Sequence, residues 1–139
     1  MPQKILIVDD EAFMLRVTEL SLKKGGYGLI FGRNGREAVK LAGGEQPALI
    51  IMDVQMPEMD GLAALRQLKQ NPATVSIPVI MLTARGHVLT RQEAEGSGAA
   101  LFLTKPCSPM QLLKEVQRIL GGAESISDPP PRSDGAASS

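Results

Sequence analysis

The sequence predicts an α/β fold in which a parallel sheet carries helices on both faces. Five short, continuous apolar runs, mostly of branched aliphatic residues, are typical of strands buried on both faces. Segments with helical spacing separate most of these runs, so strand and helix alternate along the chain. This alternation favours right-handed crossovers, and it places functional sites beyond the carboxyl ends of the strands.

The expected elements follow one another in a regular order. The strands are expected at the apolar runs, at residues 4–8 (KILIV), 27–31 (YGLIF), 48–52 (ALIIM), 77–82 (IPVIML) and 100–103 (ALFL). Helices are expected where the apolar spacing turns helical, at residues 12–24, 35–41, 62–70, 88–95 and 109–120. From residue 121 the periodicity is lost among Pro, Ser, Gly and Asp, which predicts one domain over 1–120 and a flexible, dispensable tail over 121–139.

The first expected helix has apolar residues on more than one side. Phe13, Val17 and Leu20 share one face, whereas Leu15 and Leu22 fall roughly opposite. A helix that covers a sheet needs only one apolar face. The surplus indicates either a docking patch for a partner helix or a helix that is buried widely.

Composition restricts the class of protein. A chain of 139 residues suits one domain with a core, and 15 Lys and Arg residues balance 15 Asp and Glu residues, so no global field attracts nucleic acid or acidic membranes. One cysteine excludes an internal disulfide and fits a reducing compartment. With no apolar stretch near the ~20 residues of a membrane span, we expect a cytoplasmic protein that binds neither membranes nor nucleic acid directly.

Acidic residues stand directly after two of the expected strands. Asp9 and Asp10 follow the first strand, and Asp53 follows the third. Each alone is explained by a helix cap or a turn. The first and third strands are neighbours in this topology, however, and two like charges ~4 Å apart repel by about 4 kcal/mol at an effective dielectric near 20. A positive group is therefore required, and the candidates are a divalent cation such as Mg²⁺ and Lys105.

Other residues at strand ends have structural interpretations of their own. Thr83 ends the fourth strand as an ordinary turn residue would, and Lys105 precedes a loop proline, Pro106. Pro57 stiffens the loop after Asp53, and Gly61 permits a backbone turn there. The single histidine, His87, rules out a zinc site with three histidines.

The motifs "ILIVDDE", "LIIMDVQMPEMDG", "PVIMLTA" and "FLTKP" occur in this order along the chain. Together they resemble the receiver domain of two-component response regulators, of the chemotaxis-regulator-like kind, over about residues 4–120. The resemblance implies a flavodoxin-like, doubly wound sheet with strand order 2-1-3-4-5. It also implies that the protein takes a phosphoryl group from a phosphohistidine on a sensor histidine kinase or a histidine phosphotransfer protein.

The resemblance assigns roles to the strand-end residues. Asp53 is similar to the family's phosphoacceptor, and Asp9 and Asp10 are similar to the acidic pair that serves Mg²⁺, or alternatively Mn²⁺. The backbone carbonyl of Gln55 is similar to a further metal ligand. Phosphoryl transfer mainly needs positioning and charge neutralisation, which a metal ion and Lys105 would supply.

A second group of residues corresponds to the family's switch. Thr83 resembles the hydroxyl that bonds a phosphate oxygen after modification, and Phe102 stands where an aromatic ring turns inward on activation. Core packing is the alternative interpretation for Phe102. The lysine before a cis-proline is matched by Lys105 and Pro106.

The expected function is a phosphorylation-controlled signalling module that assists its own phosphorylation and dephosphorylation but is not an enzyme in its own right. One alternative is a receiver-like interaction module that takes no phosphate. Another is a small aspartyl-phosphate phosphatase, a class that typically carries DxD after its first strand, where this chain has "VDDE". Because no DNA-binding helix pair follows residue 120, we expect either a stand-alone receiver acting on a downstream protein or a fragment without its output domain.

Overall fold

The computed structural model describes residues 3–56, 59–84, 96–105 and 108–121. Several sequence expectations lie outside these residues: the cis bond at Pro106, the roles of Pro57 and His87, the helix over 88–95, and the tail from residue 122.

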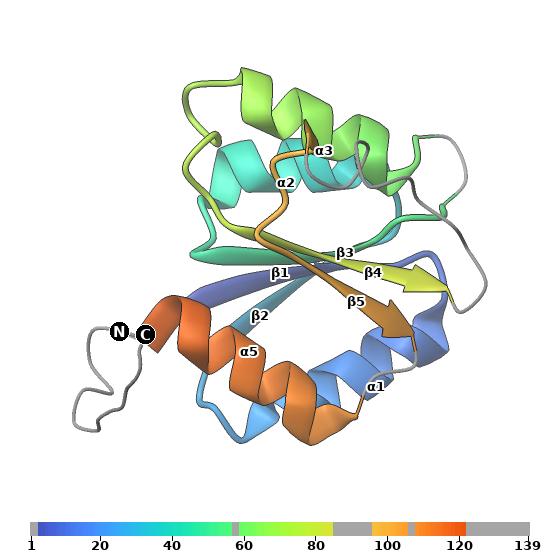
Figure 1. Cartoon of the computed structure of the whole chain (residues 1–139), viewed down its shortest axis with the longest axis vertical. Coiled ribbons are helices and arrows are strands. Elements are labelled where there is room, and N and C mark those ends of the chain that lie inside the picture. The colour runs from blue at the N-terminus through green and yellow to red at the C-terminus, as the bar shows by residue number, and fades with distance from the viewer. Residues whose placement is uncertain (1–2, 57–58, 85–95, 106–107, 122–139) are drawn as a thin grey trace.

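The fold is one sheet of five parallel strands between two layers of helices (Figure 1). The strands are β1 (Lys4–Val8), β2 (Gly28–Gly32), β3 (Leu49–Asp53), β4 (Val79–Ala84) and β5 (Leu101–Lys105). The helices are α1 (Ala12–Lys23), α2 (Gly35–Glu45), α3 (Gly61–Gln70) and α5 (Pro109–Gly121). The strand order is β2-β1-β3-β4-β5, which confirms the order that the resemblance implies.

Side chains alternate between the two faces of the sheet along each strand, which divides the core into two clusters. On β1, Leu6 and Val8 belong to the cluster beneath α2 and α3, whereas Ile5 and Ile7 belong to the cluster beneath α1 and α5. Successive side chains of a strand point to opposite faces, so a strand covered on both sides is apolar throughout. All five residues of β3 are buried, including Asp53 at its end. In the described part of the chain, no helix is long and apolar enough to cross a membrane.

α2 and α3 begin at the carboxyl edge of the sheet, and each begins at a side-chain cap. Asn34 accepts a hydrogen bond from the amide of Glu37 at the start of α2, and Asp60 accepts one from the amide of Ala63 at the start of α3. Caps of this kind satisfy amides that have no partner within the helix. They fix where the chain re-enters a helix after β2 and after β3.

The two sides of α1 differ in their surroundings. Leu15 and Leu22 are buried against the sheet, whereas Phe13 is 75% exposed and Leu20 is 54% exposed. The surplus apolar residues of this helix therefore lie at the surface rather than in a core.

Candidate functional site

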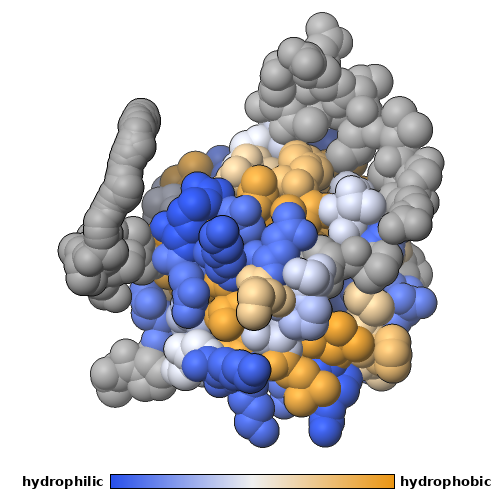
Figure 2. All heavy atoms as spheres, turned by 60° about the horizontal axis from the view of Figure 1, so that its bottom comes forward, coloured by the Kyte–Doolittle hydropathy of each residue, from blue (hydrophilic) through white to orange (hydrophobic). Residues whose placement is uncertain are grey.

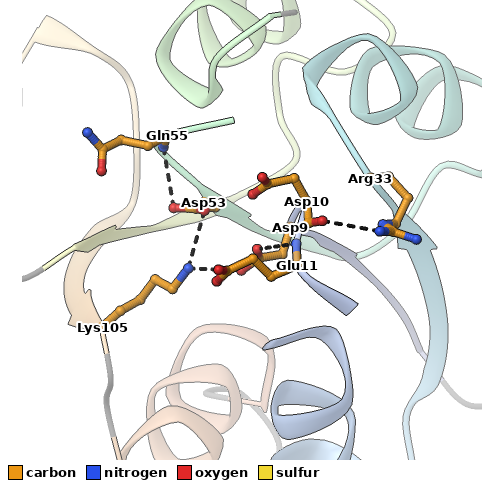
Figure 3. Close-up of polar contacts among 7 residues, drawn as sticks. All are labelled: Asp9, Asp10, Glu11, Arg33, Asp53, Gln55 and Lys105. Carbon is orange, nitrogen blue, oxygen red and sulfur yellow. Dashed lines mark hydrogen bonds and ion pairs between the residues drawn. The ribbon is translucent and has the colours of Figure 1, made fainter. Parts of the chain in front are cut away.

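Asp9, Asp53 and Lys105 converge at the carboxyl edge of the sheet (Figure 3). Asp9 directly follows β1, and Asp53 and Lys105 end β3 and β5. The two carboxylates come together because β1 and β3 are neighbours in the sheet. β4 lies between Asp53 and β5, so the four-carbon stem of the lysine spans that strand.

Both carboxylates are buried and held at each oxygen. Only 3% of Asp9 and 5% of Asp53 is exposed. The Lys105 ammonium donates to Asp9 Oδ2 at 3.1 Å and to Asp53 Oδ2 at 3.2 Å. The remaining oxygens accept backbone amides, from Glu11 to Asp9 Oδ1 at 3.0 Å and from Gln55 to Asp53 Oδ1 at 3.3 Å. The side chain of Gln55 points away from the carboxylates (Figure 3).

Burial and charge shift the pKa values in this cluster. Burial raises the pKa of Asp53 above its usual 3.8, and the neighbouring charge of Asp9 raises it further. The attraction of Lys105 opposes both effects without cancelling them. For Lys105, burial alone would lower the pKa, but the hydrogen bond to Asp9 and the charges of both carboxylates outweigh it and leave the pKa above 10.5. The lysine therefore remains charged at neutral pH.

A third carboxylate extends the cluster towards the surface. Asp10 is half-buried, and one oxygen each from Asp9, Asp10 and Asp53 lie within 4.8 Å of one another. With three carboxylates and one ammonium, the ionised cluster carries a net charge of −2. A set of oxygen donors with this excess charge is the kind of site that suits a hard divalent cation.

Sequence reasoning missed Arg33, which belongs to the surroundings of the site. Its Nη2 donates to the backbone carbonyl oxygen of Asp10 at 3.1 Å, and its own amide donates to Glu37 Oε1 at 2.7 Å (Figure 3 shows the first contact). The spacing of Asn34 and Glu37 is a capping-box signal that predicts the start of α2. No sequence signal indicates that the arginine reaches the loop of the acidic pair.

Backbone hydrogen bonds connect the loop after β3 to the first residues of α3 and of α2. The amide of Gly61 donates to the carbonyl of Val54 at 2.8 Å, and the amide of Gly35 at the start of α2 donates to the carbonyl of Met59 at 3.1 Å. A Cβ atom on Gly61 would overlap the carbonyl oxygen of Asp53, and a Cβ on Gly35 would overlap that of Met59. Both glycines thus allow backbone contacts that hold Asp53 and its loop in place.

We expect Gly61→Ala to destabilise the fold by about 2 kcal/mol or more, because the added methyl group must displace the backbone of Asp53. Gly43→Ala in α2 is the matched control. A Cβ there meets nothing within 4 Å, so the change should stabilise the protein by up to about 1 kcal/mol. Urea unfolding measures both effects. Equal stability of the two variants would show that the close approach of Gly61 is not required.

The two candidate switch residues lie on the same face of the sheet. Phe102 is the register partner of Met81, and Thr83 lies two residues after Met81 on β4. Phe102 is half-buried and packs against the cluster beneath α2 and α3. The Thr83 hydroxyl donates to the carbonyl oxygen of Leu103 at 3.5 Å, the upper limit for a hydrogen bond. This hydroxyl can therefore change partners at little cost.

Fold and site together define a class of protein: a doubly wound parallel α/β domain with an acidic cluster and a lysine at the carboxyl edge of its sheet. Residues 5–117 match the response regulator receiver domain family. A probable transcriptional regulator of Porphyra purpurea is 38% identical over 124 residues, covering 89% of this chain and 50% of that protein. The chain spans about half the length of the curated relatives that it matches.

Solved structures agree with this match. A putative response regulator from Chloroflexus aurantiacus superposes with a TM-score of 0.81 at 33% identity, over 87% of this chain and 99% of the other. The receiver domain of a sensor histidine kinase from Pseudomonas aeruginosa, solved with magnesium in its active-site cleft, superposes with a TM-score of 0.79 at 30% identity, over 87% and 99%. The chain belongs to the response regulator receiver domain family.

Proposed function

We propose that Asp53 accepts a phosphoryl group from the phosphohistidine of a sensor histidine kinase or a histidine phosphotransfer protein in the cytoplasm. The phosphorylated domain then controls a downstream protein or an output domain of a longer chain. The main support for the proposal is a contact at the edge of the sheet: Lys105 lies between the buried carboxylates of Asp9 and Asp53. The chain also belongs to the receiver domain family. Asp53 is buried and ionisable, and it lies where sites form in such folds.

The residues account for the transfer step by step. An ionised oxygen of Asp53 attacks phosphorus, a P–O bond of the acyl phosphate forms, and the P–N bond of phosphohistidine breaks. The bonding electrons leave with the imidazole nitrogen, which is protonated by water. Lys105 then exchanges its contact with Asp53 Oδ2 for a phosphoryl oxygen, so a charge-assisted hydrogen bond is kept throughout.

The acidic cluster fits a Mg²⁺ ion, and Mn²⁺ is a substitute with the same ligand preference. Oxygens of Asp9, Asp10 and Asp53 and the carbonyl of Gln55 would hold the ion, which neutralises negative charge on the phosphoryl oxygens when bound. Magnesium in the cleft of the Pseudomonas aeruginosa receiver supports this assignment. Since Asp9 and Asp53 both contact Lys105, metal binding and the lysine share the same carboxylates.

An apolar surface beside the site suits the phosphodonor. Leu20 on α1 and Met110 on α5, which is 80% exposed, flank a cavity of about 310 Å³ between the two helices, and Phe13 is a further exposed apolar residue of α1. Figure 2, which looks onto this layer, shows hydrophobic patches between hydrophilic ones. α1 begins three residues after Asp9, so a helix docked here would present its histidine to Asp53.

Incubation with acetyl phosphate and Mg²⁺, followed by intact-mass measurement, tests the proposed function. We expect the mass of one phosphoryl group to appear with Mg²⁺ and to be absent with a chelator. An interaction module would gain no mass under either condition. A phosphatase would turn over p-nitrophenyl phosphate many times per chain, which we do not expect. Either of these results would reject the receiver function.

We expect Thr83→Ala to accept phosphate but to respond weakly. A hydrogen bond to a charged group contributes ~1.5–3 kcal/mol, whereas moving a population from 1:99 to 99:1 needs about 5.5 kcal/mol. The loss of the hydroxyl should therefore reduce the structural response at Phe102 without removing it. NMR shifts of Phe102 with and without acetyl phosphate measure the response. Thr83→Ser, which keeps the hydroxyl, is the control. An unchanged response in Thr83→Ala would exclude this hydroxyl from the switch.

A further inference from the structure

Among the residues that the structure describes, no strand pairs with the outer edge of β2. In the described part of the chain, β2 pairs only with β1. The Gly28 amide donates to Gln3 and the Gly32 carbonyl accepts from Asp9, so both glycines point towards β1. The N–H and C=O of one strand residue point to the same side, and the side alternates along the strand. Leu29 and Phe31 therefore direct their N–H and C=O groups outward.

Within the described residues, this edge lacks the features that usually prevent strand association. Natural edge strands carry lysine, proline or a bulge, or are covered by other segments. The strand reads "GLIFG", with no charge and no proline, and Phe31 is 41% exposed. Ile30 packs on one face of the sheet and Leu29 on the other. The edge therefore presents an apolar side chain together with backbone groups that no described strand pairs with.

The geometry points to a second copy of this chain as the partner of this edge, with the two β2 strands antiparallel about a two-fold axis at Ile30. In that register, Leu29 of one copy lies opposite Phe31 of the other, and Phe31 opposite Leu29. Both residues point outward, so each opposed pair can exchange both N–H···O=C bonds. The Leu29 and Phe31 side chains lie on the same face of the sheet, where they form cross-strand apolar pairs.

Charges on α1 match this symmetry. Beside Phe31 lies an open groove of about 460 Å³, lined also by Ala12, Leu15, Arg16 and Glu19. Arg16 Nη1 and Glu19 Oε1 are 3.9 Å apart, and the two side chains are 70% and 37% exposed, so their contact within one copy is weak.

The two-fold axis sets the α1 helices of the two copies antiparallel and turns this groove towards the partner. Arg16 of each copy then faces Glu19 of the other. The formal net charge of zero gives the copies no overall repulsion.

The position of the interface keeps it independent of the proposed phosphorylation. Lys105 lies on β5, the strand at the opposite edge of the sheet, and the apolar cavity of the proposed donor surface lies between α1 and α5. The dimer therefore leaves Asp53 accessible. Failure of either proposal would leave the other intact.

Sedimentation equilibrium of the full chain, from low micromolar to near-millimolar concentration, tests the association. We expect the mass to rise towards twice that of one chain. Phe31→Glu should remain monomeric throughout. Val75→Glu is the matched control, since it also places a charge on an exposed apolar side chain, 45% exposed in the loop after α3, and it should dimerise as wild type does. A monomeric wild type, or a Phe31→Glu variant that still dimerises, would overturn the proposal.

A charge exchange tests the symmetry. Arg16→Glu and Glu19→Arg should each weaken dimerisation about tenfold, because each creates like-charge contacts across the axis. The double variant should recover most of the wild-type affinity. A double variant as weak as either single variant would contradict the two-fold arrangement of α1.

Hydrogen exchange locates the interface on the backbone. The amides of Leu29 and Phe31 should be protected at high concentration and lose that protection on dilution, whereas the Ile30 amide, bonded to β1, stays protected in both conditions. Protection of Leu29 and Phe31 that does not depend on concentration, or concentration-dependent protection confined to β5, would reject pairing through β2.

Discussion

Lys105→Met should lower the free energy of unfolding by about 3–5 kcal/mol at neutral pH without metal, because it leaves two buried carboxylates without their shared cation. The loss should shrink as the pH falls and Asp53, whose pKa is raised above 3.8, takes up a proton. The loss should also shrink as the pH rises above 10.5. The pKa of Lys105 is raised in the folded chain, so the stabilisation by its charge is fully present below 10.5 and is lost as the pH rises through the raised pKa. Urea unfolding at a series of pH values with a chelator measures all three regions.

Lys69→Met provides the matched control. Lys69 also donates two hydrogen bonds, at 3.0 Å to the carbonyl of Val75 and at 2.8 Å to that of Ile77, but these acceptors are uncharged. Burial lowers the pKa of Lys69, which is the reverse of the shift at Lys105. We expect its replacement to cost about 1–2 kcal/mol with little dependence on pH in the acid range. If the two variants lose equal stability, the ion pairs of Lys105 are not what holds the site together.

Mg²⁺ should stabilise the protein most strongly at neutral pH, by about 2.7 kcal/mol when its concentration is 100 times Kd. The pKa of Asp53 is higher in the folded chain than its unfolded value of 3.8, so between these two values the folded state binds more protons. The stability of the metal-free protein therefore falls as the pH rises through this window, and above it the ionised Asp53 is destabilising. A bound cation removes this penalty, and its effect should disappear as the pH falls and Asp53 is protonated.

Asp53→Asn tests both the destabilising charge of Asp53 and its part in the response to Mg²⁺. It should stabilise the metal-free protein by about 1 kcal/mol at neutral pH, because the amide resembles the protonated acid, and it should weaken the response to Mg²⁺. Asp60→Asn is the control, since Asn also caps helices well and Asp60 lies outside the cluster. Thermal melts at several Mg²⁺ concentrations would show both effects. A metal-free Asp53→Asn protein less stable than wild type would contradict the raised pKa.

The sequence predicted the architecture because buried parallel strands produce a strong signal. β1 was predicted at its observed bounds, 4–8. The fourth strand was expected at 77–82 but runs over Val79–Ala84. Apolar side chains indicate which residues are buried, whereas the bounds of a strand depend on its backbone pairing with the neighbouring strand. Ile77 is buried in the preceding loop. α2 was expected to end at residue 41 but continues to Glu45, because Gly43 and Gly44 lower helix propensity without ending the helix.

The members of the acidic cluster could be predicted, but their contacts could not. Strand-end positions and neighbouring strands were sufficient to place Asp9, Asp10 and Asp53 together, as they are within the described structure. The sequence offered both a metal and Lys105 as the positive partner, and only the side-chain geometry shows that the lysine contacts both buried carboxylates. The contact of Arg33 with the Asp10 carbonyl depends on a rotamer, for which the sequence carries no signal.

The phosphoacceptor role of Asp53 can be tested by converting the acyl phosphate into a stable product. Hydroxylamine displaces phosphate from an aspartyl phosphate and leaves a hydroxamate, which peptide mass spectrometry assigns to one residue. After treatment with acetyl phosphate and Mg²⁺, we expect a hydroxamate at Asp53 in wild type and in Asp60→Asn. We expect none in Asp53→Asn or in wild type without Mg²⁺. A hydroxamate at Asp9 or Asp10 in place of Asp53, or equal labelling of Asp53→Asn, would show that Asp53 is not the phosphoacceptor.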